Sequence, residues 1–132
     1  MESQSWPTAF PDWIERGLNT PRVVEKHFIF PIIAFTDNDQ AVTIQEQLPP
    51  SAYLAVTVIG AAIIGKSGLD AEAIWDQYRR GPGWEIEDAC AGFNGQVVEF
   101  LELDYKRALF LFGLNDRLSA REIAQALREG KL

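Results

Sequence analysis

The feature that most constrains the fold is an uncharged run over residues 53–65, YLAVTVIGAAIIG, which must be buried. Its β-branched residues favour a strand, whereas its small residues, the Pro-Pro-Ser sequence at 49–51 and the exit at Gly65 favour a helix. Periodicity alone does not separate a buried strand from a buried helix in a run of this length. We expect a helix over about 51–64 and keep a strand over 53–64 as the alternative.

The end of this run matches the phosphate-binding loop pattern G-x-x-x-x-G-K-[ST], with Gly60, Gly65, Lys66 and Ser67 at its four defined positions. In such a loop, backbone N–H groups cradle the phosphates, the lysine adds charge and the hydroxyl binds the metal ion. A small nucleotide-binding domain is therefore one functional hypothesis.

The surroundings of the match favour a buried element instead. Residues 61–64, between the two glycines, are all apolar, and the next helix start signal comes only at Asp70, after Gly68. A phosphate loop needs a helix that begins at the Gly-Lys pair, because the positive end of the helix dipole then faces the phosphates. The phosphate loop is thus the alternative hypothesis.

Length and composition predict a single small α+β domain over 1–132. The chain has 132 residues, of which 47% are hydrophobic, and a chain of this length buries about two-thirds of its unfolded surface around one core. Residues 1–10 lack periodicity, and we expect an arm that docks on the body through Trp6.

An antiparallel hairpin is expected over about 27–47. Residues 27–36 are aromatic and β-branched, residues 37–40 are turn formers, and residues 41–47 alternate between apolar and polar.

Capping and termination signals predict the helices that pack with this hairpin. Asp70 and Ser119 stand at N-cap positions, each between a leucine and an isoleucine that can form a hydrophobic staple. Residues 97–112 also fit two apolar strands, but Glu102 and Lys106 have the spacing of a helical ion pair, which favours a helix. The expected helices are 11–18, 51–64, 70–80, 96–112 and 119–129.

Acidic residues are concentrated in the middle of the chain, whose net charge is −7. Residues 37–104 carry 12 acids and 3 bases, whereas residues 105–132 carry 3 acids and 6 bases. Such a surface repels nucleic acid and anionic membranes and attracts a basic partner. Acids on a small protein also serve solubility alone, which is the alternative interpretation.

The densest acidic cluster comprises Glu85, Glu87 and Asp88, beside Trp84. A tryptophan ringed by charge suits an interface anchor, and we expect these four residues to bind the partner. The alternative is that Trp84 belongs to the core and that the acids form a solvated face.

No catalytic or metal-binding pattern stands out. His27 and Cys90 are the single histidine and the single cysteine, so they exclude a zinc site and an internal disulfide. No signal-like N-terminus and no apolar run of about 18 residues is present, and we expect a cytoplasmic protein. We therefore expect no cofactor and no metal.

Together these observations favour a non-enzymatic binding protein that masks a basic protein partner through an acidic surface. Inhibitors, immunity-type antidotes to toxins and chaperones act in this way. Binding of nucleic acid or of a membrane is not expected. The alternative remains a small nucleotide-binding domain built on the glycine-lysine-serine match.

Overall fold

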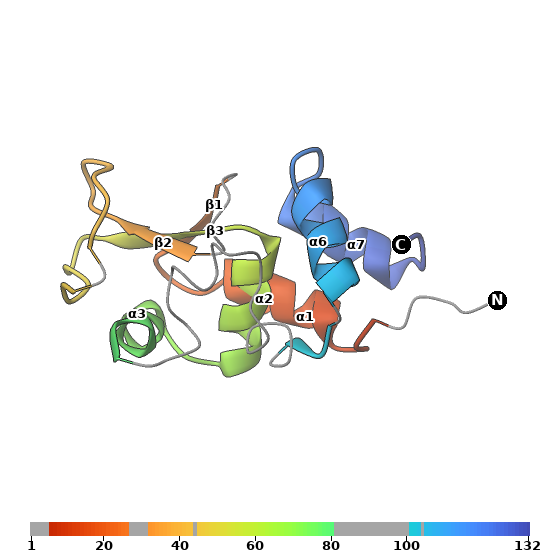
Figure 1. Ribbon diagram of the computed structural model, residues 1–132, viewed down its shortest axis with the longest axis horizontal. Coiled ribbons are helices and arrows are strands. Elements are labelled where there is room, and N and C mark those ends of the chain that lie inside the picture. The colour runs from red at the N-terminus through yellow and green to blue at the C-terminus, as the bar shows by residue number, and fades with distance from the viewer. Residues whose placement is uncertain (1–5, 27–31, 44, 81–100, 104) are drawn as a thin grey trace.

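The computed structural model describes residues 6–26, 32–43, 45–80, 101–103 and 105–132, and they form an α+β domain, as predicted. The three strands lie at one end of the molecule, α6 and α7 lie at the other, and α1 and α2 lie between them (Figure 1). In chain order the elements are α1 (Phe10–Leu18), β1 (Val23–Glu25), β2 (Ile32–Phe35), β3 (Tyr53–Val56), α2 (Val58–Ser67), α3 (Ala71–Arg80), α6 (Tyr105–Leu114) and α7 (Ala120–Arg128).

The sheet has the order β1-β3-β2, with β3 in the centre. β1 pairs with β3 in parallel, so that Glu25 lies opposite Val56. β2 pairs with β3 antiparallel, so that Phe35 lies opposite Tyr53. The predicted single helix over 51–64 is therefore wrong in its first half, because residues 53–56 form the central strand.

The second half of the run forms α2. Thr57, in extended conformation, separates strand from helix, and the helix ends at Gly68, whose φ of 71° is left-handed. Gly65, the predicted exit, lies inside the helix. Strand and helix both fit the sequence because every residue from 54 to 65 is buried, on β3 and on α2 alike.

The predicted hairpin is present in a shorter form. The chain turns over residues 36–40, where the backbone N–H of Thr36 donates to the carbonyl of Gln40 over 2.8 Å. Beyond the turn, a single bridge joins Ala41 to Phe35, so the expected strand over 41–47 is wrong past its first residues. Its described residues from 45 to 47 are exposed, whereas β3 is largely buried and is the longer partner of β2. Residues 27–31 and 44 lie outside the described residues.

α1 and α2 cross with their backbones in contact, which explains two of the glycines. A Cβ atom on Gly17 would lie 1.9 Å from the carbonyl oxygen of Ala61, and one on Gly65 would lie 1.7 Å from that of Trp13. Only glycine permits such an approach. The core around this crossing includes Phe10, Ile14, Leu54, Ile59, Ile63, Trp75, Leu111 and Ile123.

Two predicted helix starts are confirmed. The N–H of Ala73 donates to Asp70 Oδ1 over 2.9 Å at the start of α3. At the start of α7, Ser119 and Glu122 form a reciprocal capping box. The predicted helix over 11–18 is likewise confirmed as α1.

The continuous helix expected over 96–112 is wrong at residues 102–103. Glu102 is left-handed, with a φ of 59°, and α6 begins afresh at residue 105. Glu102 pairs with Lys66 over 2.9 Å rather than with Lys106. Residues 96–100 lie outside the described residues.

Candidate functional site: an acidic end of the molecule

The four residues predicted to bind a partner, Trp84, Glu85, Glu87 and Asp88, lie outside the described residues. Their role stays a prediction. His27 and Cys90 lie outside the described residues as well.

The conformation of the glycine-lysine-serine match does not favour the phosphate-loop hypothesis. Gly60, Gly65, Lys66 and Ser67 all lie within α2. From Ala61 onward, the N–H groups of this helix bond to carbonyls four residues earlier, beginning with the bond of 2.8 Å from Ala61 to Thr57, so they cannot converge on a phosphate as those of a loop do. Both glycines are buried.

The lysine and serine of the match have structural partners instead. The Lys66 ammonium lies 4.5 Å from the centroid of the Trp13 ring and 2.9 Å from Glu102 Oε2. The Ser67 hydroxyl donates to the carbonyl of Ile64 over 2.9 Å. These contacts fix the end of α2 against α1 and the residues before α6.

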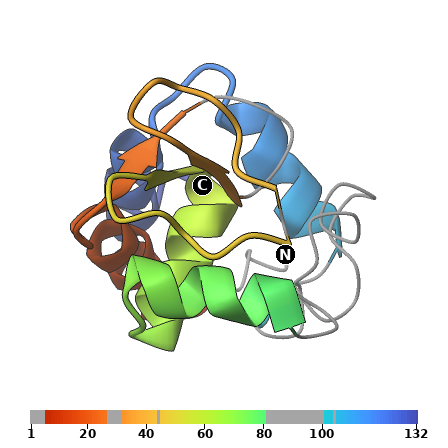
Figure 2. The ribbon, with the colours of Figure 1, turned by 90° about the vertical axis from the view of Figure 1, so that its left-hand side faces the viewer.

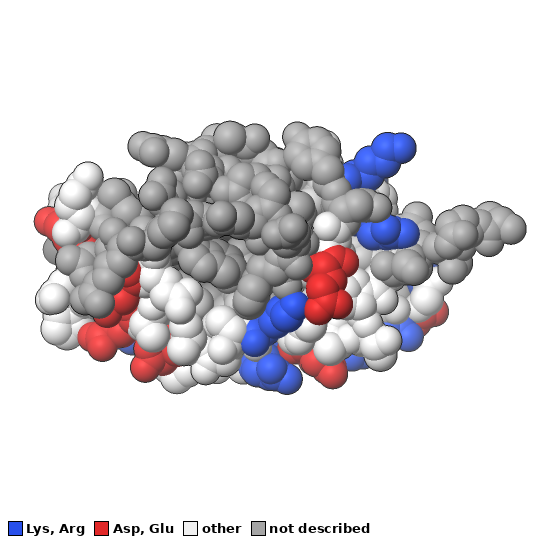
Figure 3. Space-filling model, turned by 60° about the horizontal axis from the view of Figure 1, so that its bottom comes forward, with Lys and Arg blue, Asp and Glu red and all other residues white. Residues whose placement is uncertain are grey.

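Acidic side chains of the hairpin turn, the following loop and α3 gather at one end of the molecule, which we call the acidic end. Figure 2 shows the turn and loop above α3 at this end, and acidic atoms gather at the left of Figure 3. A hydrogen bond of 2.8 Å from Trp75 Nε1 to the carbonyl of Glu46 joins α3 to the loop. The acidic end comprises Asp37, Asp39, Glu46, Asp70, Glu72 and Asp76, all exposed except the half-buried Asp76.

The hairpin and loop carry no compensating base in their sequence, since residues 32–64 contain neither lysine nor arginine. The sequence predicts an acidic middle of the chain, in which Glu85, Glu87 and Asp88 form the densest cluster. The residues of the acidic end are spread over forty positions, from 37 to 76, and only the fold brings them to one end.

At the opposite end, acids are paired within the chain. Arg128 on α7 bonds to Asp12 over 2.6 Å and to Glu15 over 2.7 Å, both on α1. The hydrogen bond from Arg128 lowers the pKa of Glu15, and the same two acids raise the pKa of Arg128. Lys131 pairs with Glu129 over 2.9 Å. Asp12, Glu15 and Glu129 are therefore used for internal contacts.

A buried polar cluster that sequence analysis missed links three elements. The side chain of Asn115, 3% exposed, accepts from the N–H of Val58 at the start of α2 and donates to Glu25 Oε2. The same Glu25 oxygen accepts from the N–H of Ala120 at the start of α7 over 2.8 Å. An asparagine between two helices is typical of a turn, so no local sequence pattern predicts the contacts of Asn115 with Val58 and Glu25. The cluster caps two helices.

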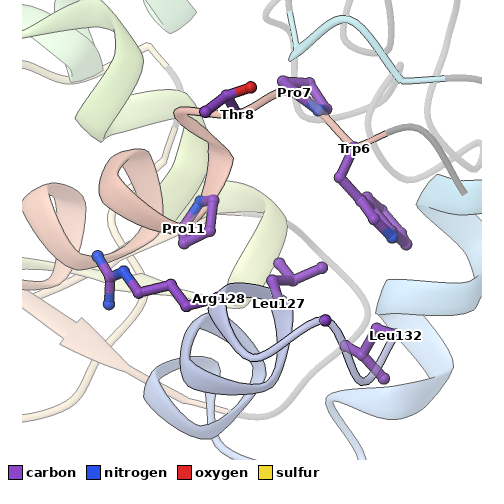
Figure 4. Close-up of a pocket in the computed structure, with 8 residues that line it drawn as sticks. Trp6, Pro7, Thr8, Pro11, Leu127, Arg128 and Leu132 are labelled. Carbon is purple, nitrogen blue, oxygen red and sulfur yellow. The ribbon is translucent and has the colours of Figure 1, made fainter.

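One hollow of about 530 Å³ lies between the segment before α1 and the end of α7. Figure 4 shows the rings and aliphatic groups of Trp6, Leu127 and Leu132 around it, whereas the guanidinium of Arg128 points away toward α1. Trp6 also stacks on Phe10, with ring centroids 6.1 Å apart. The wall is mainly apolar and brings no acid-base pair together, so the hollow does not indicate catalysis.

Neither a metal site nor a membrane span is found in the part of the chain that the structure describes. There, no three or more His, Cys, Asp or Glu side chains gather so that they could hold a metal ion. None of the described helices combines the length and the apolar character needed to cross a bilayer.

Comparison of the chain with protein-family models, with curated proteins and with solved structures finds no match.

Proposed function

We propose that this protein is a non-enzymatic binding protein that captures and masks a basic protein partner through its acidic surface, in the manner of an inhibitor, an immunity-type antidote or a chaperone. The observation that carries the proposal is the acidic end, where exposed carboxylates from the hairpin turn, the loop and α3 gather. Trp84, Glu85, Glu87 and Asp88 are proposed to bind the same partner, with Trp84 as the aromatic anchor.

The distribution of charge supports this proposal more than the net charge does. Acids that are paired within the chain, such as those bound by Arg128, attract a basic partner less strongly, because the arginine neutralises part of their charge. The carboxylates of Asp37 and Glu72 are exposed on a turn and on a helix, where they attract a basic surface during encounter. Such attraction acts mainly on the association rate and weakens as salt screens it.

The test uses charge reversal with a matched control. Asp37→Lys with Glu72→Lys changes the acidic end, and Glu85→Lys with Glu87→Lys changes the predicted segment. Asp116→Lys is the control, because Asp116 is also an exposed turn residue but lies between α6 and α7. Binding of a fluorescent hexa-arginine peptide is measured by anisotropy at low and at physiological salt.

We expect both double variants to bind the peptide more weakly, most of all at low salt, and Asp116→Lys to bind nearly as the wild type does. Circular dichroism checks that each variant is folded. Each double variant changes the net charge twice as much as Asp116→Lys does. A loss of binding energy for the double variants that is only twice the loss for Asp116→Lys would therefore reduce the effect to net charge, and the acidic end would then not be a binding surface. Absence of binding by the wild type would overturn the proposal.

A further inference from the structure

A pair of stacked aromatic rings at the edge of the acidic end already holds a cation from the same chain. Phe35 at the end of β2 and Tyr53 at the start of β3 are opposed in the sheet, with ring centroids 5.8 Å apart and planes at 29°. The ammonium of Lys26, just after β1, lies 5.5 Å from the Phe35 centroid and 5.3 Å from the Tyr53 centroid. Both distances lie within the range of cation–π attraction.

A carboxylate completes this arrangement. The Tyr53 hydroxyl donates to Asp39 Oδ1 over 2.7 Å. Asp39 has a left-handed φ of 63°, and its N–H donates to the carbonyl of Thr36 over 2.9 Å, so the hairpin turn fixes its position. The pKa of Lys26 is raised, first by its interaction with the Tyr53 side chain and also by the charge of Asp39. The surroundings thus favour a positive charge at this point.

We propose that the Phe35–Tyr53 ring pair and Asp39 form the docking site for an arginine or lysine side chain of the basic partner, and that Lys26 is an internal competitor that leaves when the partner binds. This inference rests on the proposed function and names the place where the acidic surface recognises one side chain. The position of Lys26 shows that an ammonium group fits here.

The occupant is a cation because all the groups named around the site carry negative charge or negative potential. Aromatic faces carry negative potential, Asp39 carries a full charge, and Asp37 is exposed two residues away in the same turn. A guanidinium also stacks on an aromatic plane and bonds to a carboxylate at the same time, which an ammonium does less well. An arginine of the partner therefore competes effectively with Lys26.

Displacement of Lys26 is structurally easy. Its side chain is only half-buried, and its flexible four-carbon stem can turn to solvent without moving the sheet. The rings and the carboxylate stay in place, because strand pairing and the hairpin turn hold them. The site is then preorganised for the partner's side chain.

The test removes the competitor. Lys26→Met keeps an apolar stem and deletes the ammonium, whereas Lys106→Met makes the same change of net charge on the exposed face of α6. We expect Lys26→Met to bind a fluorescent hexa-arginine peptide about two- to fivefold more tightly than Lys106→Met does, the range of an exposed cation–π contact. Phe35→Leu in the Lys26→Met background should abolish this gain.

A second comparison covers the case in which Phe35→Leu does not fold. In the Lys26→Met background, Asp39→Asn should weaken peptide binding more than Asp37→Asn does, because Asp39 contacts the ring pair through the Tyr53 hydroxyl. Asparagine tolerates the left-handed conformation of residue 39, so this variant should keep the turn. Hexa-lysine should bind more weakly than hexa-arginine to every variant that retains the rings.

The outcomes separate the two proposals. Equal affinities of Lys26→Met and Lys106→Met, or a gain that survives loss of the Phe35 ring, would overturn the docking site. The proposed function would still stand if the wild type bound the peptide and the charge reversals at Asp37 and Glu72 weakened that binding. If neither the wild type nor Lys26→Met bound hexa-arginine, both proposals would fall.

Discussion

Replacement of Gly65 by alanine tests the crossing of α1 and α2, on which the rest of the fold is built. The added Cβ would lie 1.7 Å from the carbonyl oxygen of Trp13, whereas real Cβ atoms keep at least 3.0 Å from such an atom. The obstacle is backbone, so relief requires the two helices to move apart by more than 1 Å where they pack most closely. Overpacking of this kind costs about 3 kcal/mol.

Alanine also has a higher helix propensity than glycine, which offsets about 1 kcal/mol of that cost. The net destabilisation of Gly65→Ala is therefore about 2 kcal/mol, or a fall of about 6–8 °C in Tm for a domain of this size. Urea unfolding followed by circular dichroism at 222 nm measures the free energy of unfolding.

Gly113→Ala is the matched control, because Gly113 lies inside α6 with nothing within 4 Å of the added Cβ. Here only propensity acts, and we expect an increase in stability of up to about 1 kcal/mol. Equal effects of the two substitutions would refute the backbone contact between α1 and α2. If Gly65 belonged to a phosphate loop, Gly65→Ala would instead leave the free energy of unfolding nearly unchanged and abolish ligand binding.

Three further outcomes are expected. Asn115→Leu should lower the free energy of unfolding by about 2–3 kcal/mol, because the buried N–H of Val58 loses its acceptor and Glu25 loses the amide donor of Asn115. A loss below about 0.5 kcal/mol in urea unfolding would show that the cluster is not formed. The lowered pKa of Glu15 means that its bond to Arg128 stabilises the fold above the ordinary carboxyl pKa of 4.5 and that this contribution is lost as the pH falls through the lowered value. Arg128→Met should accordingly lose less stability between neutral and acid pH than the wild type does. The free energy of unfolding is measured with urea at a series of pH values, and the same pH dependence in both proteins would contradict the pairing. Calorimetric titration with magnesium and ATP should show no binding by the wild type or by Lys66→Ala, and binding by the wild type alone would restore the phosphate-loop hypothesis.

Features of the fold that depend on neighbours in sequence were predictable. Asp70 and Ser119 cap their helices through N–H groups three residues away, so the capping pattern alone was sufficient. The division of residues 53–67 into a strand and a helix was not, because it depends on pairing with β1 and β2 and on Asn115, which lies 57 residues from Val58. The glycine-lysine-serine match had no local feature that excluded a helix passing through it.

The candidate site shows the same division. Counting charges located the acidic middle of the chain, and the fold gathers part of it at one end. The aromatic pair with its lysine was not predictable, because its residues are far apart in the sequence: Lys26 follows β1, Phe35 ends β2, Asp39 lies in the turn and Tyr53 begins β3. The parallel pairing of β1 with β3 determines where Lys26 lies, and no short-range sequence pattern predicts this pairing.

The contacts of Glu25 bear on the order in which the chain can fold during synthesis. Its carboxylate bonds to Asn115 and to Ala120, 90 and 95 residues further along the chain, and Arg128 closes a still longer loop to Asp12. While these later residues are inside the ribosome, β1 lacks the contacts of Glu25 with Asn115 and Ala120, so the free energy that they contribute to its docking is not yet available. We therefore expect the amino-terminal third to remain unfolded until residues 115–128 emerge, and folding to follow as one late, cooperative and comparatively slow step.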